Sequence, residues 1–316
     1  ICFRIEGGYA ACRELKALNV DKNSFQNEHL LKHNLIVFSE GENEKTFDVF
    51  SSLKLPEAKV NLALYHIQMG QVEQAQLALS DVPNTSPRQI AVKAMVRVQK
   101  GLKEDAIDLF ERSGNYDRDT VPGRQCMASA LILKKEFDKA NVYLESVQDY
   151  LTGDDIFNWN YGLSLAASGN FEEAEKILLQ IKDEDLLEEL LYKKWLSRCF
   201  IHNGAASRAM DLYPSRRDKQ IEFLTGVANE CFLSKDFEIS SKAFLKLKEL
   251  DQDGDYYLAI KSSTLAALQT YVDEDVPSKY SSRIKSLLNK LQSHLQPKER
   301  SAILPPLYEW FDSLQL

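Results

Sequence analysis

The sequence predicts an all-α fold in which similar pairs of helices follow one another as a solenoid. Three observations predict it. A short turn-and-helix phrase recurs six times, the copies are nearly evenly spaced, and side chains at fixed distances from each copy share their size. The phrases are MGQVEQA (69–75), KGLKEDA (100–106), KKEFDKA (134–140), SGNFEEA (168–174), NGAASRA (203–209) and SKDFEIS (234–240).

The spacing of the phrases defines a repeat. Their last residues are 31, 34, 34, 35 and 31 positions apart and are all small: Ala75, Ala106, Ala140, Ala174, Ala209 and Ser240. Twelve positions earlier stand further small residues: Ala63, Ala94, Ala128, Gly162, Ser197 and Ala228. Four positions after each phrase stand bulky ones: Leu79, Phe110, Leu144, Leu178, Tyr213 and Phe244. The residue before each earlier small one is apolar in five copies, and the exception is Lys93.

This pattern has a packing reason. Two antiparallel helices joined by a tight turn approach closely only where small side chains meet, and a bulky residue one turn later fills the space beside that contact. A period near 34 residues with these features is typical of the tetratricopeptide repeat. The sequence therefore predicts about six such repeats over residues 58–250, stacked as one right-handed superhelix. An irregular helical bundle with coincidental alanines is the alternative.

Helices are also expected on both sides of the array. We predict that residues 1–57 form a degenerate helical pair that continues from a missing N-terminal part. The evidence is the helical spacing of four apolar residues: Leu30, Leu31, Leu35 and Phe38. Residues 251–316 predict a C-terminal helical cap. In it, DQDGD forms a turn, DEDVP breaks a helix, and residues 278–295 form an amphipathic helix. Its apolar face would carry Ile284, Leu287, Leu288, Leu291 and Leu295, and Pro305-Pro306 is expected to interrupt the last stretch.

Composition narrows the class of function. The 316 residues include 39 basic and 47 acidic ones, a net charge of −8, which disfavours binding to nucleic acid or to an anionic membrane. No apolar run approaches the roughly 20 residues that span a bilayer. The five cysteines form no C-x-x-C motif and are expected to be reduced and buried. Because the chain begins at Ile1 without a methionine, we interpret it as part of a longer protein.

No residue pattern predicts catalysis, a metal or a cofactor. His29 and His33 would share a helix face, but no third ligand is evident, so packing or surface roles are expected. Asp251, Asp253 and Asp255 resemble the start of a calcium loop, yet its glycine is misplaced, at 254 rather than 256, and the twelfth position is Ser262 instead of glutamate. We therefore predict a protein that is not an enzyme.

Partner binding is the remaining function. In tetratricopeptide arrays the first helix of each pair lines a concave groove. Periodicity places six residues of repeats four to six there: Trp159, Leu163, Lys194, Arg198, Asn229 and Phe232. A tryptophan flanked by cations would suit an acidic or aromatic peptide. The alternative is that these side chains contact the chain's own neighbouring helices.

Several segments go beyond the repeat pattern. They are residues 1–38, GEN (41–43), PEAKVNLALYHI (56–67), TVPGRQCMAS (120–129), DDIFNWNYG (154–162) and KKWLSRCFI (193–201). In them the chain resembles the tetratricopeptide-repeat subunit family of intraflagellar transport complex B called the fifty-six subunit or DYF-thirteen type. The resemblance implies a non-enzymatic scaffold or adaptor on ciliary trains. It also implies that the chain binds other complex-B subunits, helps deliver motility-related axonemal cargo, and resides in the cilium or flagellum, at the basal body and in the cytoplasm.

A peptide-binding co-chaperone or a general cytosolic assembly scaffold is the alternative function. A co-chaperone that grips a C-terminal carboxylate needs lysine and asparagine at set groove positions of adjacent repeats. The first two repeats have apolar residues there: Val60, Leu64, Ala91 and Met95. The sequence therefore favours the transport subunit.

Overall fold

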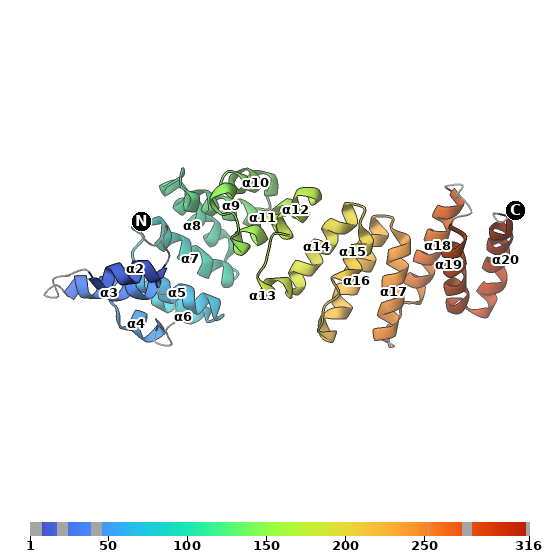
Figure 1. Cartoon of the computed structure of the whole chain (residues 1–316), viewed down its shortest axis with the longest axis horizontal. Coiled ribbons are helices and arrows are strands. Elements are labelled where there is room, and N and C mark those ends of the chain that lie inside the picture. Colours follow the sequence, from blue (N-terminus) through green and yellow to red (C-terminus); the bar gives the residue numbers. More distant parts are fainter. Residues whose placement is uncertain (1–7, 18–24, 39–45, 252, 274–279, 314–316) are drawn as a thin grey trace. The chain divides into compact units, whose positions relative to one another are not determined.

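The computed structural model describes residues 8–17, 25–38, 46–251, 253–273 and 280–313. Within these ranges the regular structure is helical and contains no β-strand, which confirms the all-α prediction (Figure 1). None of the helices in the described ranges combines the length and the apolar character needed to cross a bilayer. The chain divides into two compact units, Ile1–Tyr150 and Leu151–Leu316. The division into 1–57, 58–250 and 251–316, and the single superhelix over 58–250, stay predictions.

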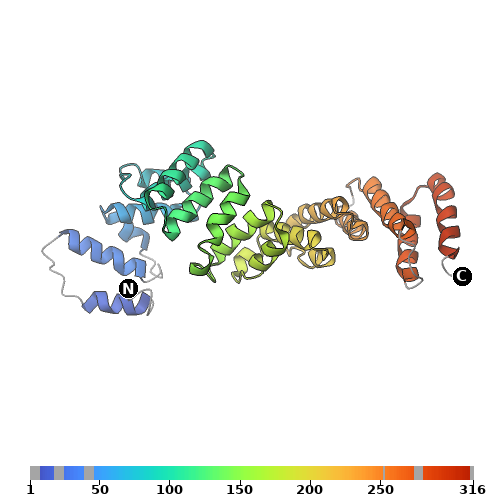
Figure 2. The same cartoon turned by 90° about the horizontal axis from the view of Figure 1, so that it is seen from above.

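The first unit is a succession of helices in which neighbours along the chain pack together. Figure 2 shows α2 and α3, in blue, lying side by side. The single helix α4 follows them, and then the pairs α5 and α6, α7 and α8, and α9 and α10. The helices are α2 (Gly8–Ala17), α3 (Phe25–Phe38), α4 (Thr46–Ser52), α5 (Pro56–Gln68), α6 (Val72–Ala78), α7 (Pro87–Gln99), α8 (Lys103–Tyr116), α9 (Val121–Leu133) and α10 (Phe137–Glu145), before a 3-10 turn at Gln148–Tyr150.

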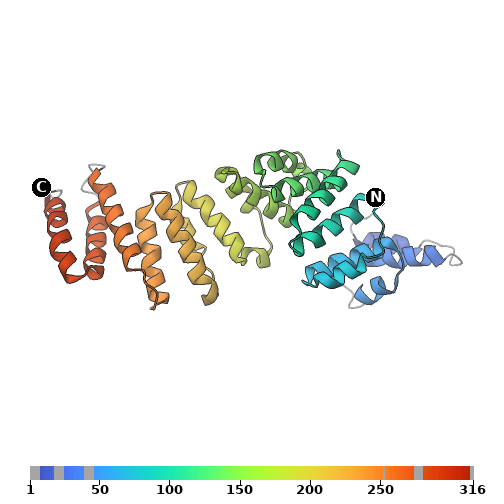
Figure 3. The same cartoon turned by 180° about the vertical axis from the view of Figure 1, so that it is seen from behind.

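The second unit continues the same alternation. Each helix pair contacts the pair that follows it, and Figure 3 shows this stacking from behind. Such nearest-neighbour packing is the defining property of a solenoid. The helices are α11 (Asp155–Ala167), α12 (Phe171–Leu178), α13 (Glu184–Leu187), α14 (Leu190–His202), α15 (Ala206–Asp211), α16 (Arg217–Leu233), α17 (Phe237–Leu250), α18 (Tyr257–Asp273), α19 (Ser281–His294) and α20 (Pro297–Ser313).

The six recurring phrases form six equivalent turns. Five positions before each phrase ends, one residue adopts a positive φ: Gly70 (69°), Gly101 (73°), Lys135 (63°), Gly169 (88°), Gly204 (74°) and Lys235 (64°). The next residue donates its N–H to the carbonyl five positions back, as in Asn170 N to Leu165 O at 2.9 Å and Asp236 N to Cys231 O at 2.8 Å. This is the Schellman arrangement, which ends a helix and reverses the chain. It explains why glycine occupies four of the six positions.

The positive φ of Lys135 is less favourable for lysine than it would be for glycine at the same position. We expect Lys135→Gly to raise the free energy of unfolding by about 0.5–1 kcal/mol, because the left-handed region is unfavourable for a residue with a Cβ. Urea unfolding followed by circular dichroism measures the change. Gly169→Ala, at the equivalent turn of another repeat, is the reverse control and should destabilise. A loss of stability in Lys135→Gly would contradict the turn assignment.

The small and bulky residues of the repeat occupy the core, as predicted. The six residues that end the phrases are each 0% exposed. The six small residues twelve positions earlier are also buried. In the last repeat the two sets touch directly, since Ser240 Oγ donates a 2.8 Å hydrogen bond to Ala228 O. Of the bulky residues only Tyr213 is half-buried rather than buried.

Helix α3 buries His33 more deeply than its leucines, of which Leu31 and Leu35 are half-buried. Leu30 is 46% exposed, whereas His33 is 7% exposed. The His33 ring lies 5.7 Å from the Phe50 ring, and its Nε2 pairs with Asn61 Nδ2 at 2.9 Å. A histidine with these contacts serves packing, as the sequence predicted.

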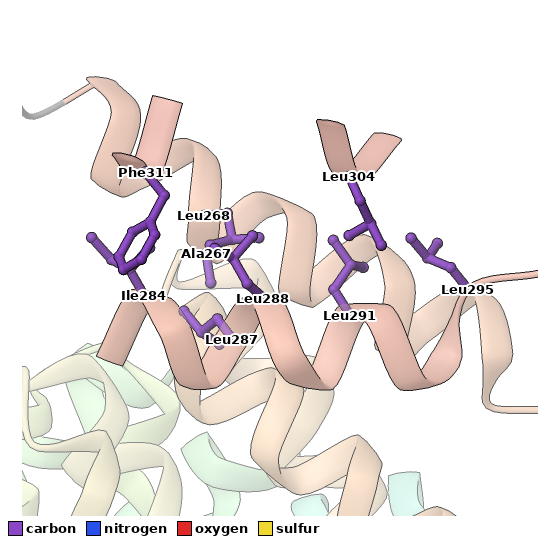
Figure 4. Close-up of a cluster of buried hydrophobic side chains, with 9 residues drawn as sticks. All are labelled: Ala267, Leu268, Ile284, Leu287, Leu288, Leu291, Leu295, Leu304 and Phe311. Atoms are coloured by element: carbon purple, nitrogen blue, oxygen red, sulfur yellow. The ribbon is translucent and has the colours of Figure 1, made fainter. Parts of the chain in front are cut away.

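Helices α18, α19 and α20 share one apolar cluster. The predicted amphipathic helix is α19, and the five predicted apolar residues, four within it and Leu295 directly after it, are buried. Figure 4 shows them facing Ala267 and Leu268 of α18 and Leu304 and Phe311 of α20. The predicted break DEDVP falls after Asp273, where α18 ends, and its other residues lie outside the described ranges.

The expected interruption at Pro305-Pro306 is wrong, because α20 continues through both prolines. A proline removes one backbone N–H donor and frees the carbonyl four residues earlier. Here those carbonyls belong to Ser301 and Ala302, which are exposed to solvent along with both prolines. The helix also gains from burying Leu304 before the prolines and Phe311 after them.

Candidate partner-binding surface

The six predicted binding residues lie on the first helices of three consecutive pairs in the second unit. Trp159 and Leu163 are on α11, Lys194 and Arg198 on α14, and Asn229 and Phe232 on α16. Trp159, Leu163 and Lys194 are half-buried, and the other three residues are exposed. Lys194 and Arg198 line one groove, whose lining does not include the other four.

The groove has a volume of about 290 Å³ and runs between α14 and α16. Its walls combine apolar surface with charged rims. It owes its depth to Gly226, since a Cβ built there would meet only Lys194 Cε, at 3.9 Å. The lining residues are Leu191, Lys194, Trp195, Ser197, Arg198, Gly226, Val227 and Glu230.

Acidic residues of α16 pair with the cations of α14. Lys194 Nζ lies 2.9 Å from Glu222 Oε1, and Arg198 Nε lies 3.0 Å from Glu230 Oε1. His202 Nε2 also contacts Glu230 Oε1, at 2.7 Å. Both predicted cations, Lys194 and Arg198, are therefore already paired with acidic residues of the chain itself. What remains available in the groove is its apolar surface.

Aromatic rings hold the groove's guanidinium in place. Arg198 Cζ lies 5.5 Å from the centre of the Trp195 ring and 5.9 Å from that of Phe171. The Phe171 ring is stacked on His202 with their centres 4.1 Å apart. Such contacts between a cation and an aromatic face are attractive. These contacts fix the Arg198 side chain at the rim of the groove before a partner binds.

Trp159 contacts the chain's own neighbouring helix. Its ring is stacked on Tyr192 of α14, with the ring centres 5.8 Å apart. Tyr192 is 3% exposed, its hydroxyl donates to Leu178 O at 3.2 Å, and burial raises the pKa of its phenol to about 12. Trp159 therefore links α11 to α14, while Phe232 packs edge-on against Phe237.

Sequence reasoning missed six of the eight residues that line the groove: Leu191, Trp195, Ser197, Gly226, Val227 and Glu230. A signal for the acidic side was present, because Glu222, Gly226 and Glu230 are four residues apart and share one face of α16. Leu191, Lys194, Trp195 and Arg198 follow the same helical spacing on α14.

The weaker candidate sites form no metal centre. No group of three or more His, Cys, Asp or Glu side chains in the described part of the chain could hold a metal ion. Asp251 instead accepts a 2.8 Å hydrogen bond from the Tyr256 hydroxyl. Cys126, Cys199 and Cys231 are buried, as predicted, and burial raises the pKa of the Cys199 and Cys231 thiols to about 12. These two cysteines are packing residues with suppressed reactivity.

Solved structures with some likeness to the chain include repeat proteins of low sequence identity. One is pilF of Pseudomonas aeruginosa, 17% identical with a TM-score of 0.46, covering 66% of this chain and 95% of that one. Another is the C-terminal part of a TPR repeat-containing protein from Cytophaga hutchinsonii. It is 15% identical with a TM-score of 0.42, covering 74% of this chain and 97% of that one.

Sequence comparison is more specific. The chain is 28% identical over 257 residues to a Caenorhabditis elegans protein named intraflagellar transport protein 56 homolog. The match covers 77% of this chain and 44% of the relative, so the chain spans less than half the length of that relative. A sequence model of the family described as intraflagellar transport protein 56 matches residues 1–316. The chain belongs to the intraflagellar transport protein 56 family.

Proposed function

We propose that the chain is a non-enzymatic scaffold or adaptor segment of intraflagellar transport complex B, located on ciliary or flagellar trains, at the basal body and in the cytoplasm. The observation that carries this proposal is the family match over all 316 residues. Its partners are other complex-B subunits, and its role includes helping to deliver motility-related axonemal cargo. The solenoid supports this role, because stacked repeats present an extended surface to a partner.

The groove between α14 and α16 is the proposed contact. Leu191 is 49% exposed at its edge although it is a large apolar residue. Trp195 supplies an aromatic wall, and the ion pairs at the rim already satisfy the nearby charges. A partner gains most here by inserting a large apolar side chain into the space left by Gly226. Buried anchors of this kind dominate the energetics of protein interfaces.

Filling the groove from within tests this contact. We expect Gly226→Leu to weaken the capture of complex-B subunits at least about tenfold, because the new side chain occupies the position of the partner's anchor. Helical glycine is a poor helix former, so the substitution should not lower the melting temperature. The measurement is quantitative pull-down from an extract of ciliated cells with the purified chain, alongside thermal unfolding.

Two further variants make the result specific. Gly226→Ala adds one methyl group and should retain most of the binding. Trp195→Ala removes a wall of the groove and should cost about 2 kcal/mol of binding free energy if the ring is a buried anchor. Full recovery of every subunit by a folded Gly226→Leu variant would exclude this groove as the contact. The remaining predicted contact residues would then be Trp159, Leu163, Asn229 and Phe232.

A further inference from the structure

A second pocket, in the first unit, differs from the α14–α16 groove in its charge. It has a volume of about 310 Å³ and lies among α6, α7 and α8. Its lining includes two cations and neither aspartate nor glutamate, whereas the lining of the α14–α16 groove includes Glu230. The residues are Gln76, Leu79, Ser80, Asn84, Lys93, Val96, Arg97 and Leu109.

Lys93 is the one departure from an apolar position of the repeat. The equivalent residues of the other five repeats are Leu62, Met127, Tyr161, Leu196 and Val227. The Lys93 ammonium donates to Val82 O and to Asn84 Oδ1, the latter at 2.8 Å. An ammonium has three donors, so one remains. Among the residues that the structure describes, no carboxylate oxygen lies within ion-pair distance of Lys93 Nζ.

The surroundings of Lys93 leave its positive charge poorly compensated. Arg97, one turn along α7, forms a long and exposed ion pair with Asp105, in which Nε and Oδ2 are 3.9 Å apart. Burial, and then the neighbouring Arg97, lower the pKa of Lys93. Other lysines of this unit have acidic partners, such as Lys100 with Glu73 at 3.0 Å. Lys93 is thus a partly desolvated cation without an acidic partner among the described residues, and the neighbouring Arg97 has only a long, exposed ion pair.

We propose that this pocket binds the carboxylate of a glutamate side chain from a partner polypeptide. Lys93 and Arg97 provide charge-assisted hydrogen bonds to the two oxygens. Leu79, Val96 and Leu109 line the pocket beside them and suit the aliphatic stem of glutamate. The proposal deepens the proposed scaffold function and rests on it for the source of the glutamate, which would be another subunit.

Titration with short peptides tests the pocket on the whole 316-residue chain. The probe is acetyl-Gly-Glu-Leu-Gly-amide, followed by the backbone amide signals of Asn84, Lys93 and Arg97 in nuclear magnetic resonance spectra. We expect saturable shifts at these residues, and at least about tenfold weaker binding of the matching glutamine peptide. Inorganic phosphate is titrated separately, to distinguish a phosphate site from a carboxylate site.

Lys93→Met is the decisive variant. Methionine occupies the equivalent position at Met127, so the repeat should accept it. Binding of the glutamate peptide should fall at least about tenfold. Lys134→Met, which removes a cation that is already paired with Glu111 outside the pocket, is the matched control and should bind as the wild type does.

Three outcomes would overturn the proposal. They are no saturable shift at about 20 mM glutamate peptide, unchanged affinity in Lys93→Met, and tighter binding of phosphate than of the peptide at the same residues. The scaffold function is judged separately by capture of complex-B subunits. If wild-type chain captures them and peptide binding is absent, the scaffold proposal stands and the carboxylate pocket does not exist.

Discussion

Replacing Gly162 with leucine is expected to lower the free energy of unfolding by about 3 kcal/mol or more, the upper end of the range for overpacked cores. A Cβ at this position would lie 2.6 Å from both Cγ and Cδ2 of Leu178. Leu178 is 0% exposed and cannot move into solvent without leaving a cavity. The helix pair α11 and α12 must therefore separate, or Leu178 must leave its place.

Thermal and urea unfolding measure this effect, and the chain supplies a matched control. Gly226 is also a glycine within the first helix of a pair, but a Cβ there would make only an ordinary van der Waals contact, with Lys194 Cε at 3.9 Å. Gly226→Ala should raise stability by about 0.5–1 kcal/mol, since alanine is the better helix former. Combining Gly162→Ala with Leu178→Ala should cost less than the sum of the two single changes. An unchanged melting temperature in Gly162→Leu would contradict the close contact of these helices.

The repeat could be predicted from the sequence because its determinants are local. Each repeat of about 34 residues encodes a helix, a reversal at a left-handed residue and a second helix. The repeat period in the sequence is therefore enough to predict the fold. Ala174 and Gly162 illustrate this, since both are buried where the spacing placed them. Pro305 shows where local preference fails, because a proline normally ends a helix. Here the helix continues, since it buries Leu304 and Phe311 and solvent reaches the carbonyl that the proline leaves unbonded.

The candidate surface was only partly predictable, because it depends on how one repeat sits against the next. Periodicity identified Lys194 and Arg198 as neighbours on α14, and both line the α14–α16 groove. It could not show that Glu222 and Glu230 of α16 lie opposite them, since that requires the lateral alignment of two helices. The same alignment decides that Trp195 lines the groove while Trp159 stacks on Tyr192.

Leu288→Ala, in the cluster of Figure 4, is expected to destabilise the second unit by about 2–5 kcal/mol. Leu288 is 0% exposed on α19 and lies in one cluster with Leu268 of α18 and Phe311 of α20. Removing its side chain leaves a cavity that three helices border. Since α18 also packs on α17, the loss should be transmitted to the repeats.

The measurement is urea unfolding followed by circular dichroism, with hydrogen exchange to locate the loss. Leu258→Ala is the matched control, because Leu258 is 62% exposed on α18 and its truncation should change stability by no more than about 0.5 kcal/mol. In a solenoid each repeat is stabilised by its neighbour, so a weakened last pair should also reduce protection in α16 and α17. If exchange instead increases only in α19 and α20, those helices form a separate appendage, and the cap does not stabilise the array.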